Sequence, residues 1–175
     1  MADTLTAFSG TNHLKTGTPT EVALAIAAAD ETARVLVFAD ASGRQTDLDV
    51  SGGAEAIRAR YAGAEEPRGR GRPKLGVIAR EVTLLPRHWD WLNDQPGGAS
   101  AALRRLIDAA RKMPEAEARA RRDAAYRFMA AIAGDYPGFE EAARALYAGD
   151  RAGLETRIAA WPADIASHAV KLAFG

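Results

Sequence analysis

The first third of the 175-residue chain alternates between a strand-like and a helix-like spacing of its hydrophobic residues. Short apolar or alternating runs predict strands at residues 5–8, 34–38 and 45–50. The Asp-Ala-Ser-Gly sequence at 40–43 supplies a turn between the last two strands. Helical spacing begins at Pro19, and a second, short helix is expected over 54–61. Residues 1–61 are therefore predicted to form a small α+β domain.

The middle of the chain changes character twice. Residues 62–74 are rich in Gly, Pro and charged residues and hold too little apolar surface to order themselves, so we expect a flexible basic arm. A strand pattern resumes at 75–85. Two helices are expected after it, one starting at Arg87 and one capped by Ser100, with the break Pro96-Gly97-Gly98 between them.

The last part of the chain, residues 113–175, has helical spacing throughout. Breaks are expected at 134–138, at Gly149-Asp150 and at Pro162. Each helix between the breaks carries one apolar stripe, which favours packing between short helices over a cofactor site. The stripes comprise Tyr126, Met129 and Ile132, then Phe139, Ala143 and Leu146, then Leu154, Ile158 and Trp161. A C-terminal helical bundle completes a predicted α+β fold.

Composition removes several classes of function. The chain has no cysteine, which excludes disulfides, thiolate zinc sites and cysteine nucleophiles. Its longest apolar stretches, such as residues 22–29, are too short to span a membrane and lack the flanks of a secretory signal. We therefore expect a soluble cytoplasmic protein with no membrane partner and no cofactor.

The formal net charge of zero hides an uneven distribution along the chain. Residues 1–66 carry a net charge of −5, residues 67–112 a net charge of +6 and residues 113–175 a net charge of −1. A basic segment of this kind indicates a polyanionic partner, because Lys and Arg release condensed counterions from phosphates. A solvated basic linker would show the same charge, so charge alone leaves both interpretations open.

The basic arm has a specific residue order. Arg70-Gly71-Arg72-Pro73 resembles the core of an AT-hook, a peptide that lies in the minor groove of A·T-rich DNA. Gly71 removes a side chain, and Pro73 holds the preceding residue extended, so the backbone is thin enough to lie deep in the groove. Arg70 and Arg72 can then reach base-edge acceptors where the narrow groove concentrates negative potential. Arginine-glycine linkers also serve solubility or RNA contact, and that alternative stays open.

The segment after the arm, residues 75–112, resembles a ribbon-helix-helix unit, found in bacterial repressors and antitoxins. The resemblance rests on a β-branched strand ending in Leu85-Pro86, a two-turn helix, a Gly-containing break and a second helix with a characteristic pattern. That pattern comprises Ser100, Leu103, Arg104, Leu106 and Ile107. Each subunit of this family contributes one strand to a two-stranded ribbon, so the resemblance implies a homodimer.

The same resemblance implies positions for DNA contact. Residues on the outward face of the ribbon, here Glu81 and Thr83, would face the major groove, although a glutamate suits that place only if it accepts from a cytosine amine. A register shift by one residue turns Arg80 outward instead but exposes Val82 and Leu84. The start of the second helix would lie on a phosphate. The phosphate contacts expected overall are Arg68, Lys74, Arg80, Arg87, Ala99, Ser100 and Arg104.

Three blocks, at residues 35–49, 71–92 and 124–164, together resemble a bacterial family known as Domain of Unknown Function 2239. The middle block, which begins Gly71-Arg72-Pro73-Lys74-Leu75-Gly76-Val77, is the most specific. The resemblance covers nearly the full length of the chain. It implies a bacterial source and no particular activity.

No catalytic or metal-binding motif stands out. His13, His88 and His168 are far apart in the sequence and lack nearby carboxylates at ligand spacing, so we predict no metal site. Phosphate-binding loops, nucleophile elbows and dinucleotide-binding fingerprints are absent from the sequence. We therefore predict that the protein is not an enzyme.

The sequence favours a DNA-binding protein of the nucleoid, either a transcriptional regulator or a nucleoid-associated protein, acting as a dimer on A·T-rich DNA. The alternative is a protein-interaction module, an antitoxin-like dimer that lacks sequence-specific DNA binding and whose C-terminal helices bind another protein.

Overall fold

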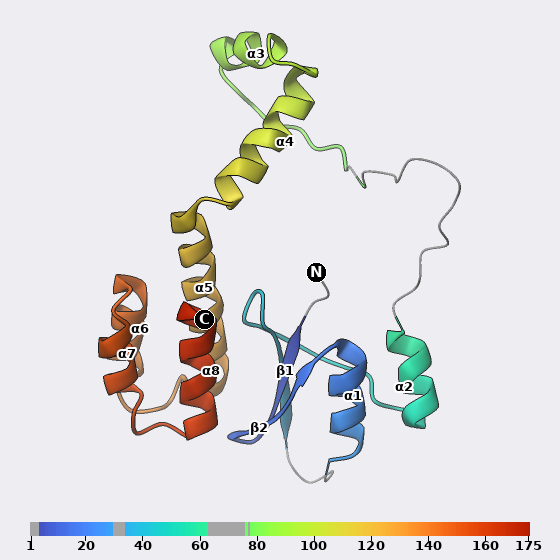
Figure 1. Ribbon diagram of the computed structural model, residues 1–175, viewed down its shortest axis with the longest axis vertical. Coiled ribbons are helices and arrows are strands. Elements are labelled where there is room, and N and C mark those ends of the chain that lie inside the picture. The colour runs from blue at the N-terminus through green and yellow to red at the C-terminus, as the bar shows by residue number, and fades with distance from the viewer. Residues whose placement is uncertain (1–3, 30–33, 63–75, 77) are drawn as a thin grey trace. The chain divides into compact units, whose positions relative to one another are not determined.

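The computed structural model describes residues 4–29, 34–62, 76 and 78–175 (Figure 1). These residues form four strands and eight helices, which confirms the predicted α+β class. They belong to two compact units, which we treat separately. Unit 1 comprises Met1–Gly63 and Glu117–Gly175, and unit 2 comprises Ala64–Ala116.

A small antiparallel sheet with strand order β2-β1-β3-β4 lies in unit 1. Its strands are β1 (Leu5–Ser9), β2 (Asn12–Gly17), β3 (Val35–Ala39) and β4 (Arg44–Thr46). The predictions of β1 and β3 are confirmed. Strand β2 was missed because its sequence, Asn-His-Leu-Lys-Thr-Gly, is mostly polar, and β4 is shorter than predicted because residues 47–50 make no ladder.

One face of the sheet is covered by the N-terminal helix α1 (Pro19–Ala27). Thr18 and Glu21 cap this helix reciprocally, which satisfies backbone N–H groups of its first turn. Val22 of α1 packs with Leu5 and Ala7 of β1 in a small apolar cluster. Helix α2 (Gly53–Tyr61) contacts α1.

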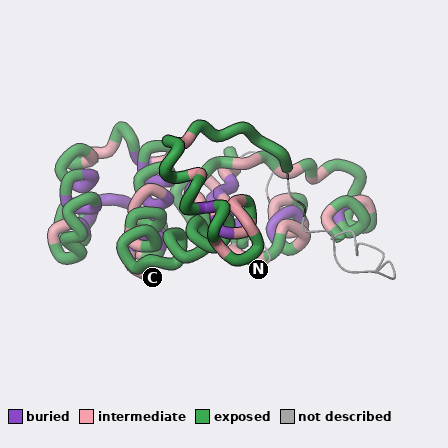
Figure 2. Tube along the Cα trace, turned by 90° about the horizontal axis from the view of Figure 1, so that it is seen from above, coloured by how far each residue is buried: buried purple, intermediate pink, exposed green. Residues whose placement is uncertain are grey.

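The opposite face of the sheet packs against the C-terminal helices. These are α5 (Pro114–Ala133), α6 (Phe139–Ala148), α7 (Arg151–Arg157) and α8 (Ala163–Phe174), and the predicted breaks between them are confirmed. Phe8 and Phe38 of the sheet meet Phe128 of α5 in the centre of the main core, where all three are fully buried. Buried and exposed positions both occur along the helices (Figure 2), as expected for amphipathic helices around a core.

The main core joins two stretches that the sequence assigned to separate domains, 1–61 and 113–175. The physical reason is that a sheet has two apolar faces, and α1 covers only one of them. Without α5 and α8, Phe8 and Phe38 would be exposed to water. The described residues 4–29 and 34–62 therefore share one core with the C-terminal helices in unit 1.

Unit 2 contains α3 (Pro86–Asn93) and α4 (Gly98–Arg111), at the places where the sequence predicts two helices. The second helix begins before Ser100, because its N-cap is Gly97 in the left-handed conformation (φ +84°). The predicted strand at 75–85 is not present among the described residues 78–85. A strand needs a partner strand for its hydrogen bonds, and this single chain gives the segment none in the part that the structure describes.

Candidate functional site

The predicted DNA-contacting residues fall into two groups. Those of the arm lie outside the described residues: Arg68, Arg70, Gly71, Arg72, Pro73 and Lys74. Those in the described part of unit 2 are exposed, except for the half-buried Ala99: Arg80, Glu81, Thr83, Arg87, Ser100 and Arg104.

The start of α4 brings three of these residues together. Ala99 and Ser100 occupy the first turn, where backbone N–H groups have no acceptor within the helix. The Arg104 guanidinium donates to Ser100 Oγ over 2.9 Å, so a positive charge lies beside the same turn. Exposed amides and a guanidinium at a helix start are the groups that bind phosphate.

Several described arginines of unit 2 have no carboxylate partner within the described part of the chain. The ion pairs found among the described residues all join side chains of unit 1, as with Arg60 and Asp49 or Arg151 and Glu155. Within the same part of the chain, no ion pair involves Arg80, Arg87 or Arg104. These guanidinium groups are available to an anionic partner.

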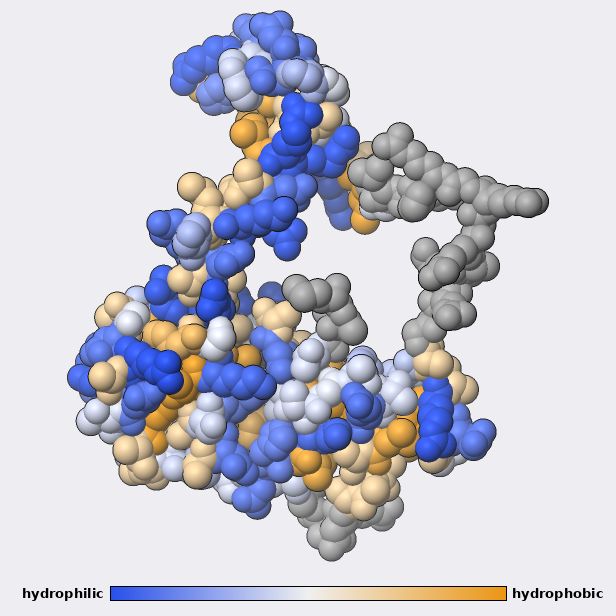
Figure 3. All heavy atoms as spheres, in the orientation of Figure 1, coloured by the Kyte–Doolittle hydropathy of each residue, from blue (hydrophilic) through white to orange (hydrophobic). Residues whose placement is uncertain are grey.

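Unit 2 exposes most of its large apolar side chains. Among its described residues only Leu92 and Ala102 are buried hydrophobic positions. The exposed ones are Ile78, Val82, Leu85, Trp91, Leu106, Ile107 and Met113, at 47 to 79% of full exposure. The surface over α4 shows this apolar character in Figure 3. Large contiguous patches of exposed apolar side chains are typical of contact surfaces.

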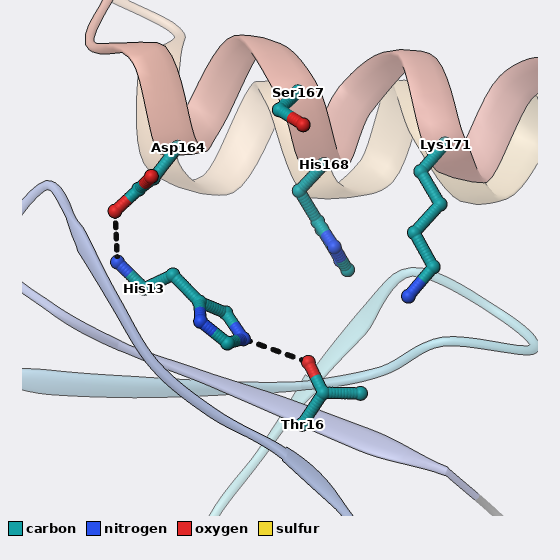
Figure 4. Close-up of a pocket in the computed structure, with 6 residues that line it drawn as sticks. All are labelled: His13, Thr16, Asp164, Ser167, His168 and Lys171. Carbon is teal, nitrogen blue, oxygen red and sulfur yellow. Dashed lines mark hydrogen bonds between the residues drawn. The ribbon is translucent and has the colours of Figure 1, made fainter.

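A polar pocket of about 300 Å³ lies in unit 1, between β2 and α8. It is lined by His13, Thr16, Asp164, Ser167, His168 and Lys171. Figure 4 shows His168 and Lys171 extending from α8 toward the strand that carries His13 and Thr16. The main-chain N–H of His13 donates to Asp164 Oδ2 over 2.7 Å, which ties the strand to the first turn of the helix.

A β-bulge brings His13 and Thr16 to the same face of the sheet. Ala7 pairs with Lys15, but its neighbour Phe8 pairs with His13, so Leu14 is an extra residue in β2. In a regular strand, positions 13 and 16 would point to opposite faces. The bulge turns both side chains toward α8, and bulges are common beside functional sites for this reason.

His168 is the most perturbed titratable residue of the pocket. It is 6% exposed and lies edge-on to the rings of Phe8 and Phe128. Burial lowers the pKa of His168 to about 4, with the Asp40 carboxylate opposing the shift and Lys171 and His13 adding to it. Its Nε2 atom is 3.7 Å from Asp40 Oδ1 and has no hydrogen-bond partner among the described residues.

Two of the three histidines, which are far apart in the sequence, lie close together in the structure. His13 and His168 line one pocket, whereas His88 lies on an exposed part of α3 in unit 2. A sequence signal for the pocket did exist, because the polar residues of α8 recur at i, i+3, i+4 and i+7: Asp164, Ser167, His168 and Lys171. In the described part of the chain, no group of three or more possible ligand side chains is arranged to hold a metal ion.

Comparison with known proteins gives one match. Residues 4–173 fit the model of the family described as "Uncharacterized protein conserved in bacteria (DUF2239)". The chain is a member of the DUF2239 family. Searches of curated proteins and of solved structures give no significant match. For this DUF2239 protein, none of the helices that the structure describes has both the length and the hydropathy of a membrane span.

Proposed function

We propose that this DUF2239 protein is a DNA-binding dimer, either a transcriptional regulator or a nucleoid-associated protein, that binds A·T-rich DNA through the arm and unit 2. The observation that carries the proposal is the surface of unit 2, where exposed apolar side chains lie on the same short helices as arginines that form no ion pair with another described residue. An apolar surface suits a second subunit, and the arginines suit phosphates.

Support for dimerisation comes from α4. Leu103, Leu106, Ile107 and Ala110 recur at i, i+3, i+4 and i+7, and Leu106 and Ile107 are 47% and 55% exposed in the single chain. An amphipathic helix gains most of its stability from burying such a stripe. A second copy would cover the stripe and would also supply the partner strand that residues 78–85 lack.

Support for DNA as the partner comes from the arm and from the start of α4. The arm has the residue order Arg70-Gly71-Arg72-Pro73, which suits the floor of a narrow groove. Ala99, Ser100 and Arg104 lie together at a helix start in the same unit, an arrangement that suits a phosphate. Two arms on one dimer would raise the affinity well above that of a single arm.

The exposed apolar surface also favours the alternative, an interaction module without sequence-specific DNA binding. The stripes of the C-terminal helices are largely buried, including Leu154, Ile158 and Trp161. A protein partner would therefore find more apolar surface on unit 2 than on those helices. DNA-binding measurements separate the two functions.

The test is fluorescence anisotropy with labelled A·T-rich and G·C-rich duplexes over a range of salt concentrations. We expect tighter binding to the A·T-rich duplex and a linear fall of log K with log salt concentration. The variant R70A/R72A should bind the A·T-rich duplex at least about tenfold more weakly and lose the preference.

The matched control is R144A/R151A, which removes two exposed positive charges from unit 1. We expect the control to bind like the wild type. Equal binding of the wild type to both duplexes, or equal losses in the two variants, would leave only non-specific charge and contradict the proposal. Absence of binding with a dimer intact would favour the interaction module.

A further inference from the structure

We propose that the pocket between β2 and α8 binds a small oxyanion, a carboxylate or a phosphate, with Lys171 as its main positive charge. This site lies in unit 1 and contains none of the residues assigned to DNA or to the dimer.

The pocket contains two donor groups that have no partner among the described residues. The Lys171 ammonium makes no ion pair or side-chain hydrogen bond with any of them, and the Ser167 hydroxyl makes no hydrogen bond. Each of the two carboxylates nearby accepts a hydrogen bond from another residue. Asp164 accepts from the His13 main-chain N–H, and Asp40 accepts from the Thr6 hydroxyl over 2.7 Å. A ligand that binds the Lys171 ammonium and the Ser167 hydroxyl must bring acceptor atoms, as an oxyanion does.

A chain of hydroxyl groups fixes the orientation and the protonated nitrogen of His13. Asp40 is acceptor-only when ionised, so the single hydroxyl proton of Thr6 points to Asp40. Thr16 must then donate to Thr6 over 3.0 Å, and His13 Nε2–H must donate to Thr16 over 2.8 Å. His13 therefore carries a proton on Nε2, and only Nδ1 remains for solvent or a ligand.

The chain of hydroxyl groups also links His13 to the Asp40 carboxylate without direct contact between the two. The Asp40 carboxylate is 17% exposed, so its field is screened less than that of a surface group. Through this chain, the orientation of the His13 ring depends on Asp40, Thr6 and Thr16.

His168 provides a second, independent indication of a ligand. Its side chain lines the pocket and is more than nine-tenths buried, yet Nε2 has no hydrogen-bond partner in the part of the chain that the structure describes. A buried polar atom without a partner costs free energy, and a bound group often removes that cost. The volume of about 300 Å³ is at the lower end of ligand sites, which fits a small anion.

Isothermal titration calorimetry of the full chain, without DNA, tests the proposal with two probes, inorganic phosphate and succinate. We expect saturable binding of at least one probe, and the better binder identifies the anion class. K171M should weaken binding at least about tenfold, the loss expected for a charge-assisted contact.

The matched control is K15M. Lys15 is exposed on the same strand, but it pairs with Ala7 and so lies on the α1 face of the sheet. K15M should bind like the wild type. Failure of both probes to bind at about 10 mM, or equal weakening in K171M and K15M, would overturn the proposal.

The hydroxyl chain has its own readout. The ¹⁵N spectrum of His13 should show protonated Nε2 in the wild type and in T16S, which keeps the hydroxyl. The variant T16V removes the hydroxyl. Anion binding should then weaken about threefold or more, and His13 should no longer prefer the form protonated on Nε2. Unchanged spectra and affinity in T16V would contradict the role of the chain. Retained anion binding in R70A/R72A separates this site from DNA binding.

Discussion

At the scale of single residues, His168 makes stability depend on pH. Its pKa is lowered to about 4 by burial, below the ordinary value of 6.5, so the unfolded chain binds a proton more readily than the folded one. The stabilisation that comes from keeping His168 neutral is complete above pH 6.5. It is lost progressively as the pH falls from 6.5 toward 4.

We expect the free energy of unfolding to fall by up to about 3 kcal/mol over that interval because of this residue. Urea unfolding at a series of pH values measures it. H168L removes the titrating group and should flatten the pH dependence between 4 and 6.5. H88Q, at an exposed position, should titrate like the wild type. An equally steep loss in H168L would show that other groups are responsible.

Gly43 gives a second prediction for a single residue. It has φ +65°, and an added Cβ would overlap the carbonyl of Ala124 in α5. The same turn is held by Arg127, whose guanidinium donates to the Ser42 carbonyl. G43A therefore combines backbone strain with a clash against main-chain atoms, and we expect a loss of at least about 3 kcal/mol of stability.

The matched control for G43A is G10A. Gly10 has a similar φ of +58°, but an added Cβ would meet no atom within 4 Å. G10A should cost only the left-handed strain, about 1 to 2 kcal/mol. Thermal and urea unfolding of both variants measure the difference. Equal losses of stability in G43A and G10A would mean that the close approach of the turn to α5 adds nothing to the cost of G43A.

At the scale of elements, α4 is an amphipathic helix with an uncovered apolar side. Because Leu106 and Ile107 are about half exposed in the single chain, charges placed there cost little unless a partner covers them. We expect L106E/I107E to convert a dimer into a folded monomer. Analytical ultracentrifugation measures the mass, and circular dichroism checks that the fold is retained.

A130E/A131E is the control for this element, since it adds the same charge at two exposed positions of α5. The control should remain dimeric. A wild type that is monomeric at micromolar concentration would contradict the dimer, and so would an L106E/I107E variant that keeps the dimeric mass.

Local pattern was a good guide to most helices, but it missed strand β2, predicted a strand at 75–85 that the described residues 78–85 do not form, and misplaced the start of α4. Helices α1 and α5 to α8 have caps, breaks and apolar spacing that are readable along the chain. Strand β2 lies at the edge of the sheet, and its residues are mostly polar. Its bulge, where the pairing steps from Lys15 to His13, also breaks the regular alternation of inward and outward side chains. The sequence predicted Ser100 as the N-cap of α4, because serine is a preferred capping residue. The spacing of residues does not reveal that Gly97 adopts the left-handed conformation and begins the helix earlier.

At the scale of the whole molecule, the proposed function makes DNA affinity depend on dimerisation. Two linked arms bind one duplex with a high effective concentration for the second contact. We therefore expect L106E/I107E to bind A·T-rich DNA at least about tenfold more weakly than the wild type. The variant should still prefer A·T-rich DNA over G·C-rich DNA, because its arm is unchanged.

Fluorescence anisotropy with both duplexes measures this coupling, and A130E/A131E again serves as the control for added negative charge. If L106E/I107E is monomeric and binds DNA as tightly as the wild type, then dimerisation and DNA binding are separate properties of the chain.

The sequence by itself determined the α+β class, most helices and the family, because these depend on the spacing and order of neighbouring residues. Only the tertiary structure decided that the first and last parts of the chain share one core. It also brought His13 to Asp164, 151 residues away in the sequence. Contacts of that separation depend on how the elements pack and on a single bulge, and neither is encoded in any local pattern.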